Sequence, residues 1–363
     1  MIIFLTIVVF ILILGVLIFA HESGHFIFAK RAGVKVQEFG FGFPPRVFGK
    51  KYKGTIYSLN AIPLGGFVKI FGEEGEGTNQ KDSFAFRSPW QRFTILFAGV
   101  LFNLIFAVLI LSIYFWLGGP TIVTEPTRYT DSSKVTSETM VWEADKGSPA
   151  DSAGIIQGDV ILEINGQQIK DFSLVQDIVR KNPNQKINLK IRREKEGKNF
   201  EITLADKNNQ GFLGIKAIEN YTSAHYPWWK VPYIAAAETV KIIWVIVSIL
   251  GLYLKNLIFK AQAPSDLAGP IGIFVLTREM IKLGAQEVLR FIALLSINLA
   301  IINILPLPAL DGGRILFIMI EKIRGRRVTP KIENLTHSIG FAALILLIIL
   351  ISWHDVIKFV IRK

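Results

Sequence analysis

The sequence predicts an α-helical polytopic membrane protein that carries one inserted α+β domain and a membrane-associated β-hairpin. Of its 363 residues, 51% are hydrophobic and 19% are charged, which is too apolar for an ordinary soluble enzyme. Four apolar runs approach or exceed the roughly 20 residues that a helix needs to cross a bilayer. A polar, turn-rich segment, about 118–226, separates the second run from the third.

We expect about four transmembrane helices, in residues 2–22, 93–117, 288–310 and 337–353. The first run could instead be a cleaved signal peptide. However, it lacks a basic start, and a cleavage site would fall inside the polar cluster that follows it. A fifth apolar segment, 232–259, is interpreted as an interfacial helix on the outer side, with a re-entrant element as the competing view.

Charge sets the expected orientation. The loop 31–92 and the short loop 321–336 are rich in Lys and Arg, which predicts that both are cytoplasmic. A crossing by 232–259 would place 321–336 outside, against this rule. Most of the clustered Lys and Arg in this chain of net charge +12 flank the apolar runs, where anchoring on the cytoplasmic side explains them, so we expect no nucleic-acid partner. Because the chain has no cysteine, any metal must be bound by histidines and carboxylates.

The loop 31–92 is expected to contain a β-hairpin. Residues 54–73, GTIYSLNAIPLGGFVKIFGE, alternate apolar and polar side chains on both sides of Pro63, Gly65 and Gly66. These three residues are turn formers, so we predict that the two alternating stretches pair with each other. An ordinary surface hairpin is the alternative.

The inserted segment has the element order of a small α+β domain. The predicted elements are a helical turn near Pro149, a strand over VILEIN, a type I′ hairpin turn at Asn165 and Gly166, a helix over 173–181, and strands over KINLKIRR and NFEITLA. This order resembles a PDZ domain in the bacterial arrangement, over about 135–206. The resemblance implies a groove to which a peptide or substrate ectodomain adds as a strand. A mere spacer or plug is the alternative.

The stretch HESGH, residues 21–25, follows the first apolar run directly. His21 and His25 are four positions apart, so on a helix they share one face and can bind one metal ion. Glu22 lies beside them and could deprotonate a water molecule, which is the H-E-x-x-H pattern of zinc hydrolases. Ionisable groups bordering a span are costly and usually functional. Two histidines that reach to the membrane interface are the alternative.

A catalytic zinc takes three protein ligands, so a third is needed. The remaining histidines are His225, His337 and His354. The first and last lie near predicted external ends, and His337 begins the fourth span. Asp311 is the better candidate, because Pro306 and Pro308 break the helix just before it, and broken helix at membrane depth needs a cavity or protein around it. A helix-end cap is the alternative.

The motifs HESGH and NILPLPALDG, in this order with a PDZ-like domain between them, resemble the site-2 protease family of intramembrane zinc metalloproteases. The resemblance is to the bacterial branch of the regulator of sigma-E protease. It includes IPLGGFVKIFGE and DLAGPIGI and extends over nearly the whole chain. Many members of this branch carry two tandem PDZ domains, whereas this chain has room for one, which puts a two-domain size filter for substrates in doubt.

The resemblance implies a function and a site. His21, His25 and Asp311 would bind one Zn²⁺, and Glu22 would be the catalytic carboxylate. Supporting or substrate-binding roles would fall to Asn303, Pro306, Pro308, Gly65, Gly66 and Phe67. The implied substrates are single-pass membrane proteins, such as anti-sigma factors or signal-peptide remnants, cleaved within a bacterial inner membrane. The active site would lie near the cytoplasmic side, and the PDZ-like domain outside.

Two other classes of function stay open. A zinc transporter would need several metal sites along a path, and only one cluster is visible in the sequence. A catalytically silent receptor would have no use for Glu22. The expected organisation is transmembrane helix 1 (1–30), cytoplasmic loop with hairpin (31–92), helix 2 (93–117), external region (118–226), interfacial helix and connector (227–287), helix 3 (288–320), basic loop (321–336), and helix 4 with tail (337–363).

Overall fold

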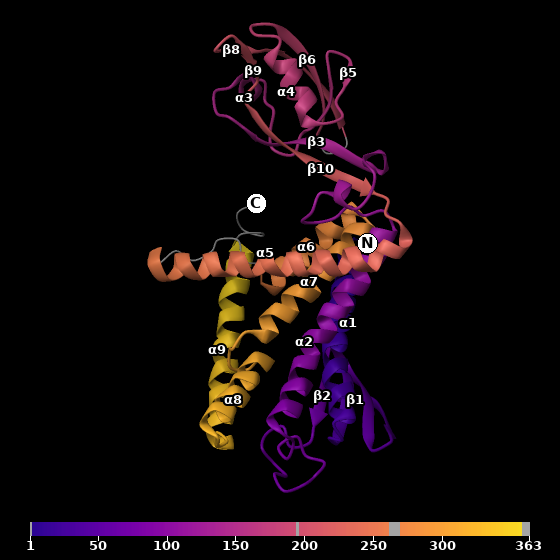
Figure 1. Cartoon of the computed structure of the whole chain (residues 1–363), viewed down its shortest axis with the longest axis vertical. Helices are drawn as coiled ribbons and strands as arrows, with labels where there is room; N and C mark the ends of the chain where they lie inside the picture. Colours follow the sequence, from indigo (N-terminus) through magenta and orange to yellow (C-terminus); the bar gives the residue numbers. More distant parts are fainter. Residues whose placement is uncertain (1, 194–195, 261–268, 358–363) are drawn as a thin grey trace. The chain divides into compact units, whose positions relative to one another are not determined.

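The computed structural model describes residues 2–193, 196–260 and 269–357 (Figure 1). The chain forms two compact units: unit 1 comprises Met1–Tyr114 and Pro232–Lys363, and unit 2 comprises Phe115–Val231. The first three residues of the DLAGPIGI motif and the expected tail after residue 357 lie outside the described residues.

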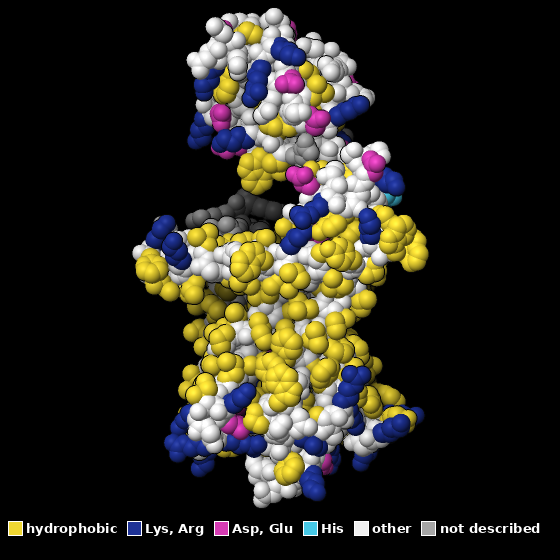
Figure 2. All heavy atoms as spheres, viewed as in Figure 1, with side chains coloured by type: hydrophobic (Ala, Val, Ile, Leu, Met, Phe, Trp, Pro, Cys, Tyr) yellow, Lys and Arg dark blue, Asp and Glu magenta, His cyan; other side chains and the backbone are white. Residues whose placement is uncertain are grey.

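Unit 1 is built mainly from apolar helices. Five of the described helices are long and apolar enough to cross a membrane: α1 (Ile2–Arg31), α2 (Pro89–Trp116), α5 (Val231–Lys260, preceded by the 3₁₀ turn Trp228–Lys230), α7 (Ala285–Ile304) and α9 (Pro330–Val356). Two shorter helices are α6 (Pro270–Leu283) and α8 (Asp311–Arg324). Figure 2 shows hydrophobic side chains over the sides of these helices, as lipid contact requires.

The four expected spans coincide with α1, α2, α7 and α9, although α7 ends at Ile304, before the two prolines. In Figure 1, α5 runs across the view, whereas α1, α2 and α9 run along its long axis. That orientation agrees with an interfacial α5, but four crossings remain a prediction, because α5 is also long and apolar enough to cross.

Helices α1 and α2 cross in direct contact at two glycines. A Cβ atom on Gly24 would lie 2.2 Å from the carbonyl oxygen of Ala98, and one on Gly99 would lie 2.4 Å from Nε2 of His25. Real Cβ atoms do not approach other atoms so closely. The missing side chains therefore let the two backbones approach, as small residues do between membrane helices.

The β-hairpin of unit 1 has a different turn from the one predicted. Strand β1 (Val36–Tyr52) pairs with β2 (Thr55–Ile70) through a two-residue turn at Lys53 and Gly54, whose φ values are 45° and 81°. The first part of β1 lies between two stretches of β2, since Phe39 is opposite both Val68 and Tyr57, whereas the second part of β1, residues 46–52, pairs only with residues 55–60. The prediction that the stretches flanking Pro63 pair with each other is therefore wrong. Lys53 and Gly54 take the left-handed conformation that such a turn needs. This turn joins β1 directly to β2, so that the first part of β1 can lie between the two stretches of β2.

Unit 2 contains the α+β elements that the sequence predicts. One sheet has the order β10-β3-β4-β6-β7, with β5 paired to β4, and β8 and β9 form a separate pair. The strands are β3 (Val135–Ala144), β4 (Val160–Ile164), β5 (Gln167–Gln168), β6 (Lys186–Arg193), β7 (Glu196–Thr203), β8 (Ala205–Lys207), β9 (Gln210–Phe212) and β10 (Ile215–Ala224). The helices are α3 (Pro149–Ser152), α4 (Phe172–Arg180) and the 3₁₀ turns Pro126–Arg128 and Ser132–Lys134.

Local sequence explains two features of this unit. Asn165 and Gly166 have φ values of 53° and 80° and connect β4 to β5, as predicted. Asp171 caps α4 by accepting a hydrogen bond from the Leu174 N–H at 2.9 Å. The Ser173 hydroxyl also donates to Asp171 and holds the pKa of that carboxyl below its usual range.

Candidate metal centre

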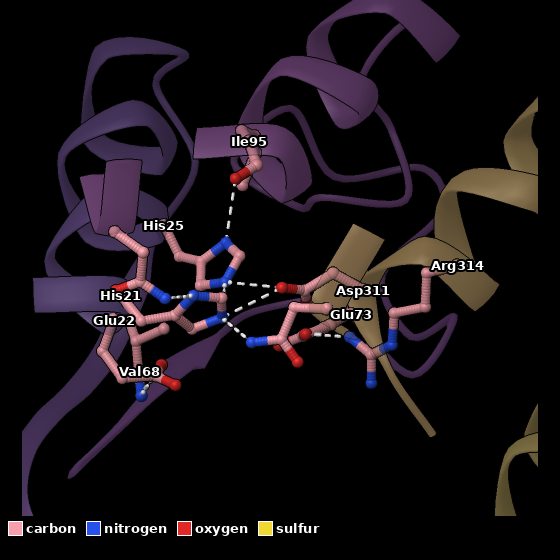
Figure 3. A network of polar contacts seen from close by, with 10 residues as sticks. His21, Glu22, His25, Val68, Glu73, Ile95, Asp311 and Arg314 are labelled. Atoms are coloured by element: carbon pink, nitrogen blue, oxygen red, sulfur yellow. Dashed lines mark hydrogen bonds and ion pairs between the residues drawn. The ribbon is translucent and has the colours of Figure 1, made fainter. Parts of the chain in front are cut away.

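Three donor atoms from two helices meet in unit 1 (Figure 3). Oδ2 of Asp311 lies 3.0 Å from Nε2 of His21 and 3.3 Å from Nε2 of His25, and the two Nε2 atoms are 3.1 Å apart. Both histidines are buried, with 7% and 5% of their surfaces exposed. The spacing suits three ligands of one zinc ion, whose bonds to His and Asp are about 2.0–2.2 Å long.

The other ring nitrogen of His25 fixes its protonation. Nδ1 lies 2.9 Å from the backbone carbonyl oxygen of Ile95 in α2. A carbonyl oxygen can only accept, so Nδ1 donates its hydrogen and Nε2 keeps its lone pair for a metal. Metal-binding histidines commonly have such a partner. The close crossing of α1 and α2 at Gly24 and Gly99 brings Ile95 within reach.

His21 has an equivalent partner in Asn103, also on α2. Its Nδ1 lies 3.2 Å from the side-chain amide of Asn103, which is fully buried. With the amide nitrogen facing His21, the ring would carry its proton on Nε2, and Oδ1 of Asn103 has no hydrogen-bond partner among the described residues. Oxygen and nitrogen of an Asn amide are interchangeable by rotation. The rotated amide accepts from Nδ1 and frees Nε2 for a metal.

Variants of Asn103 test this arrangement. Asn103→Leu is expected to weaken zinc binding about 10- to 100-fold, because His21 loses the acceptor that sets its tautomer. Asn103→Asp keeps an acceptor at that place. We expect this variant to bind zinc at least as well as the unsubstituted chain. Competition with a chelator measures both affinities. Equal affinity of the Leu variant and the parent would exclude the role of Asn103.

A break between α7 and α8 places Asp311. Helix α7 ends at Ile304, and α8 begins at Asp311, so the carboxylate belongs to the first turn of α8. Gly312 allows this turn to fold back on the end of α7, because a Cβ there would lie 2.1 Å from the carbonyl oxygen of Leu305. Gly313 is equally close to Leu307, at 2.3 Å. The two glycines therefore allow the start of α8 to contact the backbone of residues 305–307 directly.

Glu22 is held by the β-hairpin. One of its carboxylate oxygens accepts a hydrogen bond from the backbone N–H of Val68, at 3.0 Å. Val68 belongs to β2, and its N–H points to Glu22 and away from β1. Strand β2 therefore has an edge that faces the metal centre.

A cavity of about 500 Å³ opens beside these groups. Its polar lining includes the three donor residues, Glu22, Glu73, Arg314 and His337, and its apolar lining includes Phe67 and Phe341. Glu73 follows β2, and it forms an ion pair with Arg314 of α8 across the cavity. The cavity offers room for a short extended peptide beside Glu22 and the donor group.

The other predicted site residues lie at different distances from the centre. Nδ2 of Asn303 is 3.5 Å from Nε2 of His21, and Phe67 lines the cavity. Gly65 packs against Ile18 of α1, and Gly66 pairs with Phe41 in the hairpin. Neither glycine lines the cavity, nor do Pro306 and Pro308, which shape the break before Asp311. The roles assigned to these residues remain predictions.

Sequence reasoning missed the contribution of α2. Asn103 is a polar residue within the apolar run 93–117, and that isolation is the signal that could have identified it. Gly99 and the Ile95 carbonyl group carry no such signal. The sequence suggests His337 only as an alternative third ligand, and the structure places it in the cavity wall, outside the donor group.

The chain is similar to known zinc metalloproteases. The model of Peptidase family M50 matches residues 9–347. The zinc metalloprotease RasP of Shouchella clausii is 29% identical over 442 residues, covering 97% of this chain and 99% of that protein. The regulator of sigma-W protease RasP of Bacillus subtilis is 26% identical over 431 residues, covering 97% and 98%. The PDZ domain of an SdrC-like protein from Listeria monocytogenes is similar over 22% of this chain and 86% of that chain, with 20% identity and a TM-score of 0.21.

The family match and the two RasP matches, with the apolar helices and the His-His-Asp group, confirm the expected zinc metalloprotease of the site-2 type, in a bacterial multi-pass membrane protein. The family match extends over both motifs and the segment between them. The chain therefore belongs to peptidase family M50.

Proposed function

We propose that this chain cleaves the transmembrane segments of single-pass membrane proteins, and that His21, His25 and Asp311 hold the zinc ion that this hydrolysis needs. The observation that carries the proposal is the convergence of the three donor atoms, 3.0 to 3.3 Å apart, beside Glu22. Apart from its contacts with the two histidine nitrogens, the buried Oδ2 of Asp311 has no hydrogen-bond partner in the described part of the chain, which a carboxylate tolerates when it binds a cation.

The chemistry divides between the ion and Glu22. Zinc, when bound, activates water and polarises the carbonyl group of a substrate. Glu22 removes a proton from the attacking water and later delivers it to the leaving amine. The hydrogen bond from Val68 orients the carboxylate for this task, since it occupies one oxygen and restricts rotation of the side chain.

Strand β2 would receive the substrate. A transmembrane helix hides its peptide groups in its own hydrogen bonds, so it must unwind before hydrolysis. The edge of β2 that includes Val68 faces the cavity, and an unwound segment can replace its lost hydrogen bonds by pairing along this edge. Phe67 borders the same cavity and would contact a substrate side chain. Helix-destabilising residues near the cut should favour cleavage.

The substrates we propose are membrane-bound anti-sigma factors or remnants of signal peptides. The name of the Bacillus subtilis relative, a regulator of sigma-W protease, supports the first class. Unit 2 has a cavity of about 250 Å³ between α4 and residues 211–215, which we interpret as the groove of a PDZ-like domain for a peptide or a substrate ectodomain.

Cleavage by the purified chain tests the function. The chain, reconstituted in lipid vesicles, is expected to cut a model transmembrane peptide within its apolar part. A chelator should stop cleavage, and added zinc should restore it. A chain that retains zinc but leaves several such peptides intact would contradict the proposal and favour the receptor or the transporter.

The proposed orientation places the active site near the cytoplasm and unit 2 outside. Since the chain has no cysteine, single cysteines can be introduced and labelled in intact cells with a membrane-impermeant reagent. Lys170→Cys in unit 2 and Lys255→Cys near the end of α5 are expected to react, and Arg326→Cys only after permeabilisation. If Lys255→Cys reacts only after permeabilisation, α5 crosses the membrane and the interfacial interpretation is wrong.

A further inference from the structure

A histidine outside the donor group borders the same cavity. His337 lies on α9, and its Nδ1 is 2.9 Å from the backbone nitrogen of Ala309. A backbone N–H can only donate, so Nδ1 must accept with its lone pair. The neutral ring then carries its proton on Nε2. The direction of this hydrogen bond is therefore fixed.

Ala309 is a residue that needs such support. Its φ of 78° lies in the left-handed region, which an alanine rarely adopts. It precedes Asp311 by two residues, in the break between α7 and α8. Backbone groups at membrane depth must find partners within the protein. His337 gives the Ala309 N–H an acceptor that no helical ladder supplies there.

Helix α9 is held close to this break. A Cβ atom on Gly340, one turn after His337, would lie 2.3 Å from Cβ of Pro308. The ring of Phe317 from α8 lies against His337, with 5.6 Å between the ring centroids. The imidazole is therefore placed by a glycine contact on its own helix and by an aromatic contact from α8.

The two ring nitrogens of His337 differ in what they do. Nδ1 has the Ala309 contact, whereas Nε2 is shielded from solvent and has no hydrogen-bond partner in the described part of the chain. Among the described contacts, Nδ1 is therefore the ring nitrogen that links α9 to the break before Asp311.

We propose that His337 is a positioning residue: through Nδ1 it holds the backbone at Ala309 and so keeps the Asp311 carboxylate directed at His21 and His25. This inference rests on the proposed function, because it takes Asp311 as a zinc ligand. His337 itself binds neither the ion nor the substrate in this role.

A matched pair of variants separates the two nitrogens. In His337→Asn, the amide oxygen can occupy the place of Nδ1. In His337→Gln, the amide reaches the place of Nε2, and a methylene group faces Ala309. We expect His337→Gln to bind zinc about tenfold more weakly than the parent in a chelator competition, and His337→Asn to stay within about twofold. Zinc affinity is measured on the full-length purified chain without substrate.

Further variants make the outcome decisive. Gly340→Ala should push α9 from Pro308 and weaken zinc binding as His337→Gln does. Asn334→Ala, on the same helix, removes only a hydrogen bond to the Glu74 carbonyl oxygen and should match the parent. Thermal unfolding of each zinc-free variant verifies that it is folded. If His337→Gln fails to fold, Gly340→Ala against Asn334→Ala decides the question by the same measurement.

Asp311→Asn distinguishes the two ways of failing. If Asp311→Asn loses zinc while His337→Gln, or its Gly340→Ala substitute, binds as the parent does, the positioning role is overturned and the proposed metal centre stands. If Asp311→Asn keeps the parental affinity, the proposed centre is wrong, and this inference falls with it. Loss in both Asp311→Asn and His337→Gln, with recovery in His337→Asn, supports the inference.

Discussion

Glu22→Gln is expected to abolish cleavage of a transmembrane peptide while zinc content stays at the parental value. The amide has the size of the carboxylate, and its oxygen can still accept the hydrogen bond from the Val68 N–H. It cannot take a proton from water. General base catalysis contributes about 10²- to 10⁴-fold, so the initial rate should fall by at least the lower of these factors. The rate in vesicles and the zinc content of the same preparation are the two measurements.

A remote substitution of the same kind serves as the control. Glu201→Gln alters an exposed ion pair with Lys186 in unit 2 and should leave the rate unchanged. A Glu22→Gln variant that retained more than a tenth of the parental rate would show that another group is the base. Loss of zinc in this variant would mean instead that Glu22 supports the metal centre.

Gly99→Ala is expected to remove both zinc and activity, although it adds a single methyl group. The new Cβ would lie 2.4 Å from Nε2 of His25 and 2.7 Å from Cε1 of His21. Both rings must move, or α2 must withdraw and take Ile95 and Asn103 with it. Either response disrupts the donor group. Loss of a residue that only hydrogen-bonds to a metal ligand costs about 10- to 100-fold in metal affinity. Because Gly99→Ala displaces the ligands themselves, we expect zinc affinity to fall about 100-fold or more.

The control for this variant is another helical glycine. Gly251 lies on α5, and a Cβ atom there would meet nothing within 4 Å. Gly251→Ala should leave zinc affinity unchanged and should favour the helix slightly. If both glycine variants bind zinc equally well, the close contact of α2 with the two rings does not govern the centre.

The sequence allows most of the helices to be predicted, and it singles out the three residues whose donor atoms meet in the structure. Apolar runs of about 20 residues identify membrane helices, because a helix of that length crosses the bilayer and satisfies its backbone hydrogen bonds within its own segment. The spacing of His21 and His25 sets them on one helix face, and the two prolines indicate the break before Asp311. The structure brings these three residues together, and the assignment of zinc to them is our proposal.

The contribution of neighbouring helices could not be predicted in this way. An apolar run shows that a helix exists but not which face it turns to another helix, so Ile95 and Gly99 gave no signal. The hairpin was misplaced for a related reason. Its local alternation fits pairing on either side of Pro63, and only the presence of β1 between the two stretches excludes that arrangement. Contacts between distant segments decide both cases.

The short segment from Val68 to Glu73 has a consequence for chimeric proteins. It contacts the Glu22 carboxylate on α1 through Val68, and the first turn of α8 through the ion pair of Glu73 with Arg314. If the hairpin of a relative replaced this one, the relative's residue at the position of Glu73 would face Arg314 of this chain's α8. The smallest exchangeable module is thus the hairpin together with the beginning of α8, although more than 200 residues of chain separate them in the sequence.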